Sequence, residues 1–330
     1  MKGLISSMLL VPALVWGWAI LSPETRWSIS GGEAEVSLAA RNIVRGGVLP
    51  LRGRSLIQGG NLHPEEYAAF SNTHHPPVRN LIVATGFHVF GESLSVPRLI
   101  AVLCTALYLW QILWLLRRIG DDMTVVAGFL YVALSPMILY HGISIEHEPL
   151  VLACLATALR GWFSWQRWDS MRGRLLFAVA VLAACAVGWS AYFFLPGVML
   201  WHCVAGRKEN RRFLGILAAC ALLLFCLTLL HIHALRPDGL AEQWRVFVMR
   251  MGHGPDTHDD TWRRVLDSTV FRLSFLYPLG GTLLALWGIR RLMSSGLETP
   301  IAGTVVIALM HPVLYTLFLP SLVSQPPHEF

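Results

Sequence analysis

Charged and polar side chains gather at the edges of several apolar segments, and one such group lies near the middle of the sequence. Glu146, His147 and Glu148 stand directly before the apolar run VLACLATAL. An ionisable group in hydrocarbon costs about 2.5–3.5 kcal/mol at a helix centre, so such groups usually mark a function. In an extended segment the alternating spacing places both carboxylates on one side, where they can bind a divalent cation or hydrogen-bond to a sugar. The alternative, acidic capping of the following helix, explains one glutamate and leaves the triplet unexplained.

A second group surrounds a Pro-Pro pair. In THHPPVR, His74 and His75 precede the two prolines, and Arg79 follows on the next predicted helix. The prolines stiffen an extended entry and so hold the histidines in place. Two imidazoles and a planar guanidinium can together bind a phosphate. The alternative is a polar loop whose histidines lie at a membrane interface.

A third group lies earlier, in SISGGEAEVSLAARNIVRGG (residues 28–47). Its glycines favour a turn, and the following residues have helical character, with Arg41 and Arg45 on the polar side. Glu33 and Glu35 lie near the predicted start of this helix, where the helix dipole favours a carboxylate. Taken alone, the pattern is typical of an amphipathic surface helix with ordinary first-turn acids.

A fourth group is basic and aromatic. The stretch AEQWRVFVMRM, which includes Arg245 and Arg250, predicts an amphipathic helix that lies on a membrane surface. Its arginines can face anionic headgroups in general, or they can bind the phosphate of one particular lipid. The neighbouring HGPDTHDD is rich in His and Asp but matches no metal-binding spacing.

The composition is that of a polytopic membrane protein. Hydrophobic residues make up 55% of the chain and charged residues only 14%, whereas soluble domains carry about 25% charged residues. The formal net charge of +6 does not indicate nucleic acid binding, because the basic residues lie largely in short loops that orient a chain in the membrane. We therefore predict an all-α protein with about nine transmembrane segments in one domain. Their approximate ranges are 4–21, 94–116, 123–141, 149–163, 175–189, 191–205, 213–232, 269–289 and 301–320.

Basic residues in alternate short loops set the expected topology. With those loops in the cytoplasm, the amino terminus lies inside and two long segments, 22–93 and 233–268, face outside. One predicted cytoplasmic loop is RGWFSWQRWDSMRGR (160–174), whose three tryptophans we expect at the headgroup level. Nearly all the titratable side chains then lie on the outer side, in two large outer loops.

Three motifs, in this order, resemble one family. They are GGEAEVSLAARNIVRGG, then HHPPVRNLIVATGFHVFGESLSVPRL, and then ALSPMILYHGISIEHEPL. The resemblance is to the lipid-phosphate-sugar-dependent membrane glycosyltransferases of the GT-C fold, in the branch of the protein O-mannosyltransferases and the aminoarabinose transferases. It covers residues 1–165 by motif and the remainder by hydropathy. It implies a GT-C-like fold and a polyprenyl-phosphate sugar as donor.

The resemblance also implies a general base in the first outer loop, which takes a proton from the acceptor. The family's usual Asp-Glu pair falls on Gly32 and Glu33 here. Because a glycine stands at the aspartate position, the base is expected to be Glu33 or Glu35. Inversion at the anomeric carbon is likewise implied by the family.

Two further roles are carried over from the family to the second and third motifs. A residue beside Pro-Pro contacts the donor phosphate, which here is His74 or His75, and an acid in the next outer loop helps to build the site, which here is Glu146 or Glu148. Arg79 and, in reserve, the arginines of the second long loop are expected to steady the leaving phosphate. A divalent cation at Glu146 and Glu148 is the only cofactor the sequence suggests.

The sequence thus predicts an integral membrane glycosyltransferase, in a bacterial inner membrane, that acts at the outer face. Its acceptor is a hydroxyl of a lipid, a glycan or a protein. Two alternatives remain: a non-catalytic transporter or assembly partner, and a polymerase or ligase of lipid-linked glycans. The middles of the predicted spans carry few polar residues to line a transport path, which disfavours a transporter.

Overall fold

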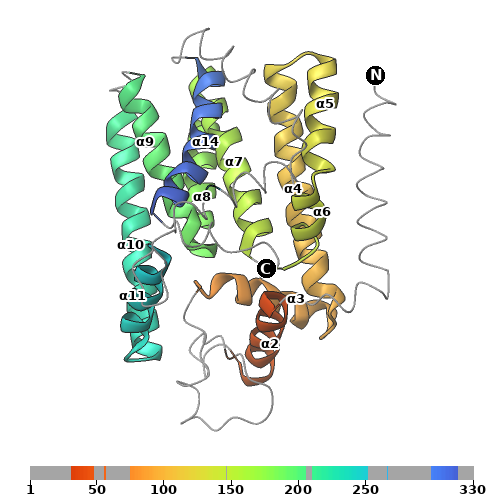
Figure 1. Ribbon diagram of the computed structural model, residues 1–330, viewed down its shortest axis with the longest axis vertical. Coiled ribbons are helices and arrows are strands. Elements are labelled where there is room, and N and C mark those ends of the chain that lie inside the picture. The colour runs from red at the N-terminus through yellow and green to blue at the C-terminus, as the bar shows by residue number, and fades with distance from the viewer. Residues whose placement is uncertain are drawn as a thin grey trace. The chain divides into compact units, whose positions relative to one another are not determined.

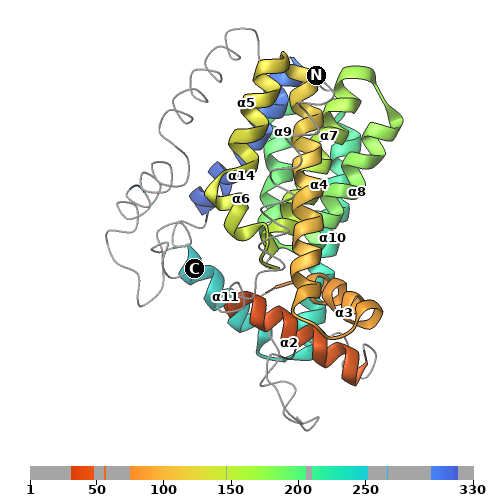
Figure 2. The ribbon, with the colours of Figure 1, turned by 90° about the vertical axis from the view of Figure 1, so that its right-hand side faces the viewer.

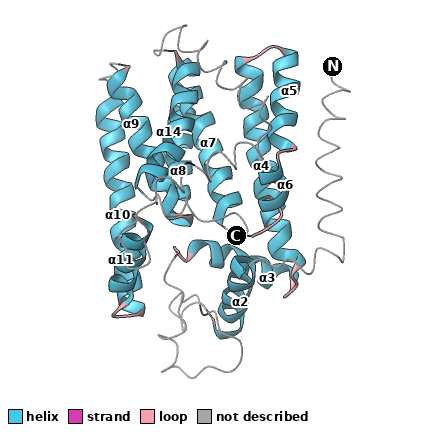
Figure 3. Cartoon of the chain, in the orientation of Figure 1, coloured by secondary structure: helices cyan, strands magenta, loops and turns pink. Residues whose placement is uncertain are grey.

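The computed structural model describes residues 31–47, 56, 75–145, 147–205, 210–251, 266 and 299–318, which form helices and short loops and no β-strand (Figures 1 and 3). The predicted spans 4–21 and 269–289 lie outside these residues. The described helices are α2 (Gly31–Gly46), α3 (Val78–Phe90), α4 (Ser95–Ile119), α5 (Asp122–Ala133), α6 (Pro136–His141), α7 (His147–Trp168), α8 (Met171–Val187), the 3-10 helix η3 (Trp189–Phe193), α9 (Phe194–Val204), α10 (Arg211–Leu235), α11 (Gly239–Arg250) and α14 (Pro300–Phe318).

The chain divides into two compact units. The first comprises Met1–Thr157 with Ala234–Arg236, and the second comprises Ala158–His233 with Pro237–Phe330. The boundary falls within α7, whose first residues belong to the first unit and whose remainder belongs to the second. All three predicted motifs of acids, histidines and arginines before residue 150 therefore belong to the first unit.

In the first unit, α2 and α3 lie across one end of α4 (Figures 1 and 2). The buried stripe of α2 follows the helical period, with Val36, Ala39, Ala40 and Ile43 at most 2% exposed. Fully burying a side chain such as Ile43 contributes about 1.5–3 kcal/mol. This stripe is the reason that an otherwise polar helix stays attached to the unit.

The junction of α3 and α4 depends on a glycine. A Cβ atom at Gly86 would lie 2.9 Å from both Ile100 Cδ1 and Val96 Cγ1, so a larger residue here would displace these two side chains of α4. After α3 the chain turns at Gly91, whose φ of 85° is a conformation that glycine adopts without strain. The turn leads directly into the first residues of α4.

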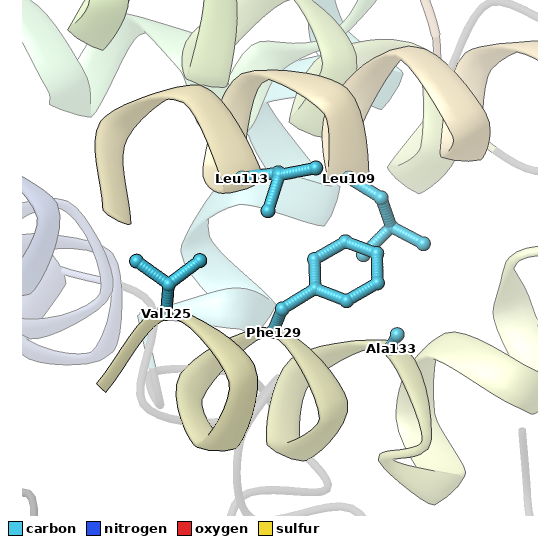
Figure 4. Close-up of a cluster of buried hydrophobic side chains, with 5 residues drawn as sticks. All are labelled: Leu109, Leu113, Val125, Phe129 and Ala133. Atoms are coloured by element: carbon cyan, nitrogen blue, oxygen red, sulfur yellow. The ribbon is translucent and has the colours of Figure 1, made fainter. Parts of the chain in front are cut away.

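A hydrophobic cluster joins α4 to α5. Leu109 and Leu113 of α4 face Val125, Phe129 and Ala133 of α5, and none of the five is more than 6% exposed (Figure 4). The four-residue spacing of these side chains on both helices forms ridges that pack into the grooves of the neighbouring helix.

The predicted span 123–141 is two helices rather than one. Asp121 caps the start of α5 by accepting a hydrogen bond from Thr124 N at 2.8 Å. The helix ends at Ala133, and Ser135 then caps α6, with its hydroxyl oxygen 3.4 Å from Ile138 N. Pro136 at the first position of α6 has no N–H to donate to α5, which explains the break.

The second unit corrects the predicted loop at 160–174. Its residues are the end of α7 and the start of α8, separated only by Asp169 and Ser170. Trp162 and Trp165 are 0% and 3% exposed, so these two indoles pack inside the protein, whereas Trp168 is exposed. Burial of the indoles is achieved by packing against Trp201 and Phe177, which no short-range pattern indicates.

Two glycines bring α7 and α8 together. A Cβ at Gly161 would lie 2.5 Å from Phe177 N, and one at Gly173 would lie 2.7 Å from Trp165 N. The two backbones are thus in direct contact, as small residues permit in membrane helix pairs. Around η3, the helices α8, α9 and α14 complete the packing of this unit.

Two of the described helices, α4 and α10, are long and apolar enough to cross a membrane. On α4 one stripe of apolar side chains is exposed, formed by Leu99, Leu103, Leu107 and Trp110. Exposed apolar side chains in such a row need an apolar neighbour, which for a span-length helix is lipid. The chain is an integral membrane protein, as the composition predicts.

Candidate active site

A buried ion pair joins the first turn of α2 to the first turn of α4. Arg98 Nε donates a hydrogen bond to Glu33 Oε1 at 3.0 Å, and the two side chains are only 8% and 3% exposed. Removing two charges from water is costly, and good hydrogen-bond geometry offsets much of that cost. The pair therefore specifies where the acidic end of α2 lies on α4.

The two candidate bases of α2 face different environments. Glu33 is buried, whereas Glu35 is exposed. Residues two apart on an α-helix point about 200° away from each other, so burial of one places the other on the outer side. The structure thus separates two carboxylates that the sequence left equivalent: Glu33 is engaged by Arg98, and Glu35 is accessible from outside the unit.

The far end of α2 is held by a second, exposed network. Glu92, in the turn between α3 and α4, accepts hydrogen bonds from Arg45 Nε at 3.1 Å and from Arg45 Nη2 at 2.8 Å. Arg41 Nε lies 3.3 Å from the same carboxylate. These hydrogen bonds from Arg45 lower the pKa of Glu92, and the charge of Arg41 acts in the same direction. Together with Glu33–Arg98, this network attaches α2 at both ends.

The structure describes only some of the residues that are predicted to bind the donor phosphate. His74 lies outside the described residues, while His75 is half-buried just before the Pro-Pro pair. Arg79 is buried in the first turn of α3, next to the equally buried Asn80. The prediction that Arg79 follows the prolines on a helix is confirmed, since α3 begins at Val78.

The opening of α7 holds the third predicted group. Glu148 lies in the first turn of α7 and is half-buried. Glu146 and the side chain of His147 lie outside the described part, and with them the predicted cation site. Among the residues the structure describes, no three His, Cys, Asp or Glu side chains lie close enough together to hold a metal ion.

A hydrogen bond from α4 positions the segment that leads to Glu148. Thr105 Oγ1 donates to the carbonyl oxygen of Gly142 at 3.0 Å, and both residues are buried. A Cβ at Gly142 would lie 2.9 Å from Thr105 Cγ2, so the contact also requires the glycine. Five residues later the chain enters α7, which makes Thr105 a support for the segment that carries the acids.

Two predicted arginines of the second long loop, Arg245 and Arg250, lie on α11 in the second unit. Arg245 of α11 is exposed and pairs with Glu242 at 2.7 Å, one helical turn earlier. The side chain of Arg250 lies outside the described part. The stretch predicted as an amphipathic helix is therefore a helix, α11.

Sequence analysis missed two residues of this site, Arg98 and Thr105. Arg98 had a usable signal, because it is a charged residue near the start of a span-length apolar helix and such residues are rarely without a partner. Thr105 had none, since a single threonine in an apolar helix is common and usually bonds to its own helix.

These helices have the all-α fold of the polytopic GT-C membrane glycosyltransferases. Residues 74–232 match the model of the dolichyl-phosphate-mannose-protein mannosyltransferase family. The fold is similar to the crystal structure of ArnT from Cupriavidus metallidurans bound to undecaprenyl phosphate, with a TM-score of 0.70 and 14% sequence identity. That likeness covers 98% of this chain and 58% of ArnT, so the chain spans little more than half the length of that protein. No curated protein matched in sequence.

The resemblance predicted from the three motifs is therefore confirmed by two different comparisons. The family match includes the Pro-Pro motif and the acidic entry to α7. The stretch with Glu33 and Glu35 precedes the matched residues. In the structure it belongs to the same compact unit as the Pro-Pro motif and the start of α7.

Proposed function

We propose that this protein transfers a sugar from a polyprenyl-phosphate donor to an acceptor hydroxyl at the outer face of the membrane. The observation that carries this proposal is the shared fold with ArnT, which was solved with undecaprenyl phosphate bound. The geometry of the first unit supports it, because an acidic helix is fixed at one end of a span-length helix, where a lipid-borne sugar would meet a water-borne acceptor.

Glu35 is the proposed general base. As the acceptor oxygen forms its bond to the anomeric carbon, the Glu35 carboxylate takes the hydroxyl proton, and the bond from the anomeric carbon to the phosphate oxygen breaks. Attack from the face opposite the leaving group inverts that carbon. Glu35 suits this role because it is exposed, so an acceptor can reach it.

Glu33 is proposed as a positioning residue instead. Its buried carboxylate already accepts a hydrogen bond from Arg98, so an acceptor hydroxyl has less access to it than to the exposed Glu35. By holding the first turn of α2 on α4, Glu33 determines where Glu35 lies. The two glutamates thus take different parts in one reaction.

The leaving polyprenyl phosphate requires stabilisation as its charge develops. His74, His75 and Arg79 are the proposed donors, because a guanidinium and imidazoles placed beforehand stabilise a phosphate without rearranging. Burial of Arg79 supports this role, since a charge in a water-poor place acts strongly on a nearby anion.

Glu148, with Glu146, is proposed to bind the donor sugar or a divalent cation that bridges sugar and phosphate. Carboxylate oxygens serve both purposes. The hydrogen bond from Thr105 to Gly142 supports this assignment, because it holds the segment that precedes Glu148 against α4.

A second function is favoured by one specific observation. Gly32 stands at the position of the family's usual aspartate, and the adjacent Glu33 is engaged by Arg98. A chain that retains the fold but lacks the base would serve as a non-catalytic assembly partner. Substitution of Glu35 distinguishes the two: loss of transfer supports an enzyme, whereas unchanged cellular phenotype supports the partner.

Binding of the lipid is the direct test of the donor class. Undecaprenyl phosphate added to the purified chain is expected to raise its thermal unfolding midpoint in a concentration-dependent way, because a ligand that binds only the folded state stabilises it. Phosphatidic acid, which carries a similar charge on ordinary acyl chains, is the control. An equal response to both lipids would argue against a polyprenyl-phosphate site.

A further inference from the structure

The corner between α3 and α4 exposes a compact group of apolar side chains. Val89 and Phe90 end α3 and are 63% and 69% exposed, and Leu94, just before α4, is 41% exposed. Large apolar side chains this exposed, grouped on one turn, usually contact a partner or a membrane. We call Val89, Phe90 and Leu94 the corner wedge.

The depth of the corner wedge in the membrane can be inferred from the uncharged length of α4. The residues between Arg98 and Arg117 carry no charge and, at 1.5 Å per residue, span about 27 Å, close to the thickness of a bilayer's hydrocarbon core of about 30 Å. Leu94 precedes Arg98 by about one helical turn. The corner wedge therefore lies at the boundary between the acyl chains and the headgroups.

The charges beside the corner wedge complement an anionic surface. Glu92 lies within the same turn, and its carboxylate is paired with both Arg41 and Arg45 of α2. Two guanidiniums and one carboxylate leave one net positive charge, and the side chains of Arg41 and Arg45 are 44% and 66% exposed. Basic side chains beside an inserted apolar group are the usual arrangement of surfaces that bind anionic lipids.

We propose that the corner wedge docks into the headgroup boundary of a leaflet that contains anionic phospholipid, with Arg41 and Arg45 facing the lipid phosphates. Since the same two arginines hold Glu92, the docked corner is joined to α2, and the height of α2 above the bilayer is set by this contact. The surface is independent of the proposed transferase activity, because it involves neither Glu35 nor the residues assigned to the donor.

Photo-crosslinking in vesicles tests this docking. The full chain is reconstituted in phosphatidylcholine and phosphatidylglycerol at 3:1, with p-benzoylphenylalanine in place of Phe90, and adducts are identified by mass spectrometry. Leu103, exposed in the middle of α4, is the positive control for lipid contact, and Ala34, exposed on α2, is the negative control. Phospholipid adducts at Phe90 near the yield at Leu103 are expected; crosslinks to protein instead, or a yield no higher than at Ala34, would overturn the proposal.

The adducts also report on the arginines. If Arg41 and Arg45 face the phosphates, the ratio of phosphatidylglycerol to phosphatidylcholine in the Phe90 adducts is expected to be roughly threefold to fivefold higher than in the vesicle, as one net positive charge near a surface implies. The Arg41→Gln/Arg45→Gln double variant should return the ratio to the bulk composition. A bulk ratio with the arginines intact would contradict the headgroup assignment.

Discussion

Arg98 and Glu33, which are 65 residues apart in sequence, form a buried ion pair whose hydrogen bond measures 3.0 Å. It joins the first turns of α2 and α4 and leaves Glu35 on the outer face of α2. The proposed division of roles between the two glutamates rests on this contact. The carboxylate of Glu33 is buried and holds α2 on α4, whereas the carboxylate of Glu35 is exposed.

Breaking the pair from either side should destabilise the protein. Arg98→Gln leaves the Glu33 carboxylate buried without its cation, and such a loss typically costs about 3–5 kcal/mol. The thermal unfolding midpoint of the purified chain should fall clearly in Glu33→Gln and Arg98→Gln. In the double variant, part of the loss should be recovered, because no charge is left unpaired. Equal unfolding midpoints of wild type, the two single variants and the double variant would show that the ion pair does not stabilise the fold.

Replacing the exposed Glu35 should abolish activity and leave stability unchanged. Glu35→Gln removes the proposed base, which typically contributes a factor of about 10² to 10⁴ in rate, while the exposed side chain contributes little to packing. Sugar transfer, or the phenotype that depends on it, should be lost with the unfolding midpoint unchanged. Glu35→Asp, which keeps the carboxylate, is the matched variant and should retain measurable activity. Full activity of Glu35→Gln would remove Glu35 from the mechanism.

The Glu92 network predicts a dependence of stability on pH. Hydrogen bonds from Arg45 lower the pKa of Glu92 in the folded protein. The stabilisation is therefore present above the unfolded-state pKa and is lost as the pH falls through the lower folded-state pKa. The difference in unfolding midpoint between wild type and Glu92→Gln should be largest near neutral pH and should shrink below about pH 4. High salt should also shrink it, since these side chains are exposed.

The contact between α7 and α8 should not tolerate even one methyl group. In Gly161→Ala the new Cβ would lie 2.5 Å from Phe177 N, which is backbone and cannot rotate away. Separating the helices should cost about 1–3 kcal/mol. Gly215→Ala on α10 is the control, because a Cβ there meets nothing within 4 Å, and alanine favours a helix over glycine. A Gly161→Ala variant as stable as Gly215→Ala would show that the two helices are not in backbone contact.

Local patterns predicted most of the described helices and the class of protein. Runs of apolar residues indicated α4 and α10, and the first-turn acids with a helical period indicated α2. The motifs also pointed to the family, since their order along the chain does not depend on packing. Ser135 and Pro136 are typical of a helix start, so the sequence held a signal for the break between α5 and α6. The apolar residues on both sides of it were nevertheless interpreted as one continuous span.

The site itself could be predicted only in part. The partner of Glu33 depends on how α2 crosses α4, which is decided by a tertiary contact between distant residues. The same reason accounts for Trp162: its charged neighbours are typical of a loop, whereas its burial depends on Trp201 and on Gly303, where a Cβ would lie within 2.6 Å of the Trp201 ring. A local sequence pattern shows which side chains a helix carries, but it does not show which distant residues those side chains will contact.

The central claim is that a polyprenyl-phosphate sugar is the donor. The most direct measurement is mass spectrometry of the lipids that co-purify with wild type, Glu35→Gln and the structural control Glu33→Gln. If the account is correct, a polyprenyl-phosphate sugar will be enriched on Glu35→Gln over wild type, because binding persists while transfer stops. If folded protein of every form carries no polyprenyl lipid, the donor assignment is wrong, and the chain is better explained as a non-catalytic assembly partner.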